Sequence, residues 1–290
     1  MTTTLTSPAR QANTRTIEAT DRIGLREAIA HSLTLAHRGL LKVKHNPEQL
    51  FDVVIQPIIF TFMFTYIFGG AISGDVESYL PIIIPGILVQ TVITASIVTG
   101  TQLREDMDKG VFDRFKSLPI ARIAPLSGAL IADVVRYLIA TTITVVDVVR
   151  YLIATTITVV VGIAMGYRPG GGFVGVVCAA LLVMVCAFAI SWIFALMGVL
   201  MSKAASVQGT SMMILFPLTF MSNAFVPADT MPGWMQAFVN VNPVSHLVTA
   251  VRELANSGHF GIHAVYALLG AAVIVAIMAP LTVRIYMRKA

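Results

Sequence analysis

The stretch LREDMDKGVFDRFKSLPIAR, residues 103–122, places a dense run of charges between two long apolar segments. Eight of the thirteen residues from Arg104 to Lys116 are ionisable, and this charge density is too costly for the interior of a bilayer. The apolar residues among them recur at helical spacing and would form one stripe along a helix. They are Val111, Phe112, Phe115 and Leu118. The stretch therefore predicts an amphipathic cytoplasmic helix that a soluble partner protein can bind.

The composition around this stretch is that of an integral membrane protein. Hydrophobic residues make up 56% and charged residues 12% of the 290 residues, whereas soluble domains contain about 25% charged residues. Six apolar runs are long enough to cross the hydrocarbon layer, which takes about 20 residues. They lie near residues 50–69, 80–101, 123–167, 172–200, 206–226 and 262–283. The sequence thus predicts an all-α membrane protein with six transmembrane helices, if the overlong third run counts once.

Lys and Arg residues gather on one side of this predicted topology. Seven precede the first span, five lie between the second and third spans, and three close the chain. Lys203 lies between the fourth and fifth spans, and the remaining loops hold Arg168 and Arg252. By the positive-inside rule, both termini and the 103–122 stretch are cytoplasmic. The net charge of +5 is explained by this topology, and we find no nucleic-acid-binding motif that would add another cause.

The chain before the first span divides into two parts. Residues 1–22 are rich in Thr, Ser and Arg and lack an apolar run, so they predict a disordered cytosolic tail rather than a signal peptide. In residues 23–47 apolar side chains step by three or four between basic ones. This pattern favours an interfacial amphipathic helix on the inner leaflet, with a soluble helix as the alternative. Residues 48–290 form the predicted six-span domain.

A second polar segment, residues 227–256, follows the fifth predicted span. Asp229 can cap a helix that starts near Pro232, and the pair Asn242-Pro243 breaks the chain before another short helix. We expect two short re-entrant helices on the outer side, because backbone groups at that depth must be hydrogen-bonded within the protein.

No pattern for covalent chemistry is present in the sequence. The six histidines form no HxxxH or HExxH spacing, and Cys178 and Cys186 lie eight residues apart, about 12 Å along one helix and beyond disulfide reach. There is no GxxxxGK[ST] phosphate loop. We therefore expect no catalytic residue, metal site or cofactor in this chain, and any use of ATP would require a separate ATPase.

Two segments resemble the type-2 ABC-transporter permeases, and within them the daunorubicin-resistance permease group. These segments are YLPIIIPGILVQTVITASIVTGTQLREDMDKGVFDRFKSLPIARIAP and VPADTMPGW…VNPVSHLVTAVREL. The resemblance implies six spans, an interfacial N-terminal helix, a coupling helix after the second span and re-entrant outer helices before the sixth. It also implies a pair of permease subunits, with a homodimer expected, in the cell membrane. Two separate ATPase subunits would bind ATP and Mg and drive the export of hydrophobic drugs, natural products or lipids.

The resemblance assigns roles to two sets of residues. Those that couple to the ATPase are Lys109, Gly110, Phe112, Asp113, Arg114, Phe115 and Pro119. Those in the pore-lining second and fifth spans are Gln90, Thr91, Thr94, Met212, Phe216, Phe220 and Asn223. The second set is assigned by span rather than by motif.

The sequence DVVRYLIATTITVV occurs twice in tandem without a difference, at residues 133–146 and 147–160. The distance from Asp147 to Tyr167 along a helix is about 30 Å, or one bilayer. Length therefore predicts that the second copy lies in the membrane and the first toward the cytosol. The opposite register would bury Asp147 and Arg150 beyond the midplane, at roughly 2.5–3.5 kcal/mol per charge. A functional role for the repeat, such as a lengthened coupling lever, is the alternative to an incidental duplication.

The sequence as a whole favours the permease subunit of an ATP-driven exporter. The alternative from another class is a proton-coupled secondary transporter of small apolar molecules, which needs an ionisable pair buried near the midplane. The candidate pairs are Asp133/Arg136 and Asp147/Arg150, and length places them near the inner boundary. A third alternative is an energy-independent scaffold for lipid or polysaccharide.

Overall fold

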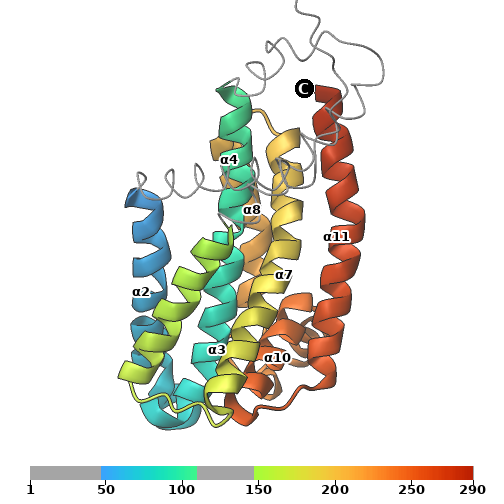
Figure 1. Cartoon of the computed structure of the whole chain (residues 1–290). Coiled ribbons are helices and arrows are strands. Elements are labelled where there is room, and N and C mark those ends of the chain that lie inside the picture. Colours follow the sequence, from blue (N-terminus) through green and yellow to red (C-terminus); the bar gives the residue numbers. More distant parts are fainter. Residues whose placement is uncertain (1–46, 110–146, 290) are drawn as a thin grey trace, which may run out of the picture.

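The computed structural model describes residues 47–109 and 147–289, and these residues form helices joined by turns, without a strand (Figure 1). The predicted tail 1–22, all but the last residue of the predicted interfacial helix 23–47, and most of the coupling segment lie outside the described residues. So does the first copy of the repeat.

The described helices form a bundle. They are α2 (Pro47–Ser73), α3 (Val76–Ala95), α4 (Ile97–Asp108), α7 (Gly172–Leu200), α8 (Ala204–Phe220), the 3-10 helix η2 (Ala228–Thr230), α9 (Gly233–Val241), α10 (Pro243–Ser257) and α11 (Ile262–Lys289). A further helix, Asp147–Ala164, is drawn yellow-green without a label, and we name it the repeat helix. In Figure 1, α4 continues α3 toward the end of the bundle that holds the C-terminus, whereas α10 lies toward the opposite end.

Five of the described helices are long and apolar enough to cross a membrane. They are Val54–Ser73, Val76–Asp108, Asp147–Ala164, Gly172–Leu200 and Ile262–Tyr286. The predicted fifth span, 206–226, corresponds to α8, an apolar helix of 17 residues that is shorter than the roughly 20 residues needed to cross. The all-helical architecture is confirmed for the described residues, with five helices long and apolar enough to cross a membrane.

Caps in the sequence set the ends of α3 and α10. Asp75 begins α3 by accepting hydrogen bonds from the backbone amide of Ser78 at 2.6 Å and from its hydroxyl at 3.0 Å. These bonds lower the pKa of the Asp75 carboxyl. The predicted break at Asn242-Pro243 is where α10 begins, and the Asn242 side chain accepts from the amide of Val244 at 2.9 Å. The helix ends at Gly258, whose φ of 69° favours glycine.

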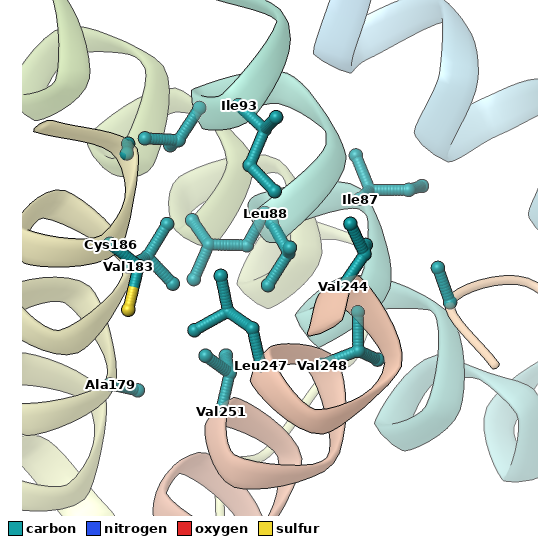
Figure 2. Close-up of a cluster of buried hydrophobic side chains, with 14 of the residues drawn as sticks. Ile87, Leu88, Ile93, Ala179, Val183, Cys186, Val244, Leu247, Val248 and Val251 are labelled. Carbon is teal, nitrogen blue, oxygen red and sulfur yellow. The ribbon is translucent and has the colours of Figure 1, made fainter. Parts of the chain in front are cut away.

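Apolar side chains of α3, α7 and α10 meet in a buried core, shown in Figure 2. Leu88 of α3, Val183 of α7 and Val248 of α10 are among its members and are nearly inaccessible. The span that combines α3 and α4 is 89% buried over its apolar window, whereas that of α11 is only 11% buried. Helix α3 is therefore the central helix of the described bundle.

Two glycines bring the backbones of α4 and α7 into contact. A Cβ atom on Gly100 would lie 2.2 Å from the carbonyl oxygen of Phe194, and one on Gly198 would lie 2.3 Å from the carbonyl oxygen of Gly100. Close packing of small residues is a main source of helix association in membranes. The position of α4 along α7 is therefore tightly fixed.

Candidate functional site

The structure describes only the first residue of the predicted coupling set. Lys109 follows the last turn of α4, and its Nζ atom lies 3.4 Å from Oε2 of Glu105. One turn earlier, Arg104 pairs with Asp108 and donates from Nη1 to the carbonyl oxygen of Met201 at 2.9 Å. Arg104 thereby joins the end of α4 to the connection between α7 and α8. The other predicted coupling residues lie outside the described residues, namely Gly110, Phe112, Asp113, Arg114, Phe115 and Pro119.

The predicted path residues of the second span lie inside the bundle. Gln90, Thr91 and Thr94 of α3 are buried. Among the described residues, Oε1 of Gln90 and the hydroxyls of Thr91 and Thr94 have no hydrogen-bond partner. The interior of α3 thus carries unused hydrogen-bonding capacity, an uncommon property for buried side chains.

Two of the predicted path residues of the fifth span, Met212 and Phe216, face outward instead. Helix α8 buries one residue per turn, namely Val207, Ser211, Leu215 and Thr219. Met212 and Phe216 are exposed, and Phe220 and Asn223 are half-buried. The Phe216 and Phe220 rings stack with their centroids 4.1 Å apart. Because the first predicted set is interior whereas Met212 and Phe216 of the second face outward, the described part of the chain does not by itself enclose a path lined by both sets.

A polar cluster joins α10 to α3 at the end of the bundle opposite the C-terminus. We name it the α10 clasp and define it as Tyr79, Tyr167, Asn223, Arg252 and Asn256. Two of its members bind carbonyl oxygens of α3: Arg252 donates from Nη2 to Ile82 at 3.1 Å, and Asn256 donates from Nδ2 to Pro81 at 2.9 Å. Arg252 also donates to the carbonyl oxygen of Asn223 at 2.9 Å. The clasp therefore ties α10 both to α3 and to the turn after α8.

The bond from Asn256 replaces one that α3 cannot make. In an uninterrupted helix the carbonyl of Pro81 would accept from the amide of residue 85, but Pro85 has no N–H. Tyr167 donates to Oδ1 of Asn256 at 2.6 Å and so orients its amide. Burial raises the pKa of Tyr167 to about 12, so the hydroxyl keeps its proton near neutral pH.

Sequence reasoning missed the clasp. Arg252 entered the sequence analysis only through the distribution of positive charges, and no role was predicted for Asn256. The available signal was the spacing of Thr249, Arg252 and Asn256, which places three polar residues on one helical face. Thr249 also accepts from Nδ2 of Asn223 at 2.8 Å.

A second polar cluster lies where α3 meets α4. We name it the junction cluster and define it as Ser96, Thr99, Asp147, Arg150 and Tyr151, all of which are buried. The last three belong to the described part of the repeat helix, Asp147–Ala164. Nη1 of Arg150 lies 3.3 Å from Oδ1 of Asp147.

Comparisons with known proteins show relatives over most of the chain. Residues 31–255 match the ABC-2 type transporter family. The daunorubicin resistance ABC transporter permease protein DrrB1 of Streptomyces coeruleorubidus is 44% identical over 286 residues, which cover 98% of this chain and 95% of that protein. The probable doxorubicin resistance ABC transporter permease protein DrrC of Mycobacterium tuberculosis is 24% identical over 231 residues, covering 79% and 78%. The putative transport permease ycf38 of Cyanophora paradoxa is 23% identical over 229 residues, covering 78% and 74%.

Proposed function

Because the chain belongs to the ABC-2 type transporter family, we propose that it is the permease subunit of an ATP-driven exporter of hydrophobic drugs, natural products or lipids. The observation that carries the proposal is the 44% identity to a daunorubicin resistance permease over 98% of the chain. The apolar spans and the exposed Met and Phe side chains of α8 suit an apolar cargo. The hydroxyl and carbonyl groups of such a cargo could form hydrogen bonds with the unpartnered polar side chains of α3.

We propose six spans with both termini in the cytoplasm. Helix α8 and the turn that follows it form the fifth, and the positive-inside rule supports the orientation. Residues 1–22 are the cytosolic tail and residues 23–47 the interfacial helix. Helices α9 and α10 are the re-entrant outer pair. The exposure of Trp234 and Phe238 on α9 supports this placement, because aromatic side chains favour the membrane interface.

We propose that the working assembly contains two permease subunits, as a homodimer, and two separate ATPase subunits that bind ATP and Mg. The outward orientation of Met212 and Phe216 supports a second subunit, since a path lined by both predicted sets needs another surface to close it. ATP-driven closure of the ATPase would displace the coupling segment 103–122 and, through α4, the central helix α3. The cargo site would then alternate between the two sides of the membrane.

Transport in inside-out membrane vesicles tests this proposal. Vesicles that contain the chain and its ATPase should accumulate doxorubicin when ATP is added, and a protonophore should leave this uptake unchanged. Uptake that needs no ATP and collapses with the protonophore would instead support the proton-coupled alternative. A polypeptide with a phosphate loop should also copurify with the chain.

A further inference from the structure

The helical hydrogen-bond ladder is interrupted between α3 and α4. The amide of Ser96 donates to the carbonyl of Ile93 at 3.0 Å, and the amide of Thr99 donates to that of Ser96 at 3.2 Å. Both bonds span three residues instead of four, so the amide of Thr99 is not directed to its usual partner, the carbonyl of Ala95. A 3-10 segment inside a long helix often marks a hinge. The helix that carries the coupling segment is therefore locally weakened at Ser96.

The repeat helix gives the carbonyl of Ala95 a donor and adds two bonds to side chains of the junction. Arg150 donates from Nη1 to the carbonyl of Ala95 at 3.4 Å, and the Tyr151 hydroxyl donates to Oγ of Ser96 at 2.8 Å. On the α4 side, the Thr99 hydroxyl donates to Oδ2 of Asp147 at 2.6 Å. The three repeat-helix residues lie at i, i+3 and i+4 and so share one face. One helical turn thus contacts the last residue of α3, the turn residue and the first turn of α4.

Burial of the ion pair between Asp147 and Arg150 is costly, which argues that the pair has a role beyond packing. Asp147 is 1% exposed and Arg150 is 2% exposed, and ionisable residues inside membrane spans are rare and usually functional. Apolar side chains at both positions would complete the span at a lower desolvation cost. Among the described residues, Nη2 of Arg150 has no hydrogen-bond partner. The guanidinium therefore has a spare donor with which it can follow a shift of the junction.

We propose that Asp147, Arg150 and Tyr151 are positioning residues that brace the α3–α4 junction, so that displacement of the coupling segment moves α3 instead of bending the chain at Ser96. This inference deepens the proposed function and rests on it. Without the brace, the ATPase would still bind and hydrolyse ATP, but less of its motion would reach α3. Loss of the brace should therefore lower the amount of drug moved per ATP.

The tandem repeat provides a matched control for each substitution. Tyr137 and Asp133 stand in the same 14-residue sequence as Tyr151 and Asp147, so the residues that follow the two members of each pair within the repeat are the same. Tyr151→Phe removes one hydroxyl without changing the shape of the ring. Asp147→Asn removes the charge that pairs with Arg150. Tyr137→Phe and Asp133→Asn make the same changes in the first copy.

The experiment measures doxorubicin uptake and ATP hydrolysis together in vesicles that contain the permease and its ATPase. We expect Tyr151→Phe and Asp147→Asn to lower the uptake per ATP about three- to tenfold, the range that corresponds to one interhelical hydrogen bond. Copurification of the ATPase and its basal rate should be unchanged, and the first-copy variants should transport normally. An unchanged ratio in Tyr151→Phe, or an equal or larger loss in Tyr137→Phe, would overturn the proposal.

The same vesicles separate this inference from the function on which it rests. If the wild-type protein shows no ATP-dependent uptake, the proposed function fails. If the wild type transports with ATP and both second-copy variants keep its ratio, the brace alone fails. A loss of expression or thermal stability without a change in the ratio would show that the cluster only stabilises the fold, and this result would also overturn the proposal. Arg150→Lys should retain part of the ratio, because its ammonium keeps the positive charge that pairs with Asp147.

Discussion

The replacement of a proline-lost hydrogen bond by Asn256 can be tested by a double-mutant cycle. Asn256→Leu removes the donor that binds the carbonyl of Pro81 at 2.9 Å and the acceptor that binds the Tyr167 hydroxyl at 2.6 Å. No helical amide can serve this carbonyl, because Pro85 lacks an N–H. The variant therefore leaves one backbone acceptor without its partner and also breaks the bond to Tyr167, which lies in the loop after the repeat helix.

The expected cost follows from these two interactions. A buried carbonyl that loses its partner costs about 1–3 kcal/mol, and we take the lower end because Pro81 and Asn256 are only half-buried. The bond to Tyr167 adds the roughly 0.6 kcal/mol that is average for interhelical side-chain hydrogen bonds in membranes. Asn256→Leu should thus lower the free energy of unfolding by about 1.5 kcal/mol. Tyr167→Phe should lower the free energy of unfolding by roughly 0.6 kcal/mol, the contribution of the bond to Asn256 alone.

Pro85→Ala supplies the missing donor from within α3. In that background the new amide can bind the carbonyl of Pro81, so Asn256→Leu should cost about 1 kcal/mol less than in the wild type. The assay is reversible unfolding of the purified protein in mixed micelles by increasing the mole fraction of SDS. Pro280→Ala, in the part of α11 remote from the clasp, is the control and should be additive with Asn256→Leu. Additivity within about 0.3–0.5 kcal/mol for the Pro85 pair would refute the reasoning.

Three further predictions concern coupling, topology and the repeat. Phe115→Ala should remove an apolar anchor worth about 2 kcal/mol or more at an interface and uncouple transport from ATP hydrolysis; normal pull-down of the ATPase and drug-stimulated hydrolysis in Phe115→Asp would contradict this role. After both native cysteines are replaced, an impermeant thiol reagent added from outside should label single cysteines at Asp75 and Asp229 but not at Asp108 or Arg288. Labelling at position 108 would overturn the topology. Deletion of either copy of the repeat produces the same sequence with one Asp/Arg pair, so export should persist. Loss of export at normal expression would show that the duplication is required.

The sequence predicted those parts of the fold that depend on local composition. Apolar runs identified the spans, and the Asn242-Pro243 pair located the start of α10, because both signals act over a few residues. The short fifth span was not predicted. The apolar run extends to residue 226, but the helix ends at Phe220, just after Pro217 and before the polar pair Ser222 and Asn223.

The candidate site was less predictable, because it depends on which faces and which distant backbone groups meet. The family pattern placed Gln90 and Phe216 in path-lining spans, but a span assignment does not say which face of the helix is enclosed. Pro85 in an apolar run indicated that one carbonyl of α3 would lack a donor. It gave no sign that the donor would come from Asn256, which lies 175 positions from Pro81.

The register of the repeat is fixed by contacts downstream of it and not by the repeat itself, since the two copies offer identical side chains. If the first copy occupied the span, every later residue of that helix would be replaced by the residue 14 positions before it. Leu152 would take the place of Gly166, whose φ of 103° is strained for any side chain that has a Cβ. Ile153 would take the place of Tyr167 and could not donate to Asn256. Length predicted the same register, and these two anchors give the structural reason why the second copy lies in the bundle.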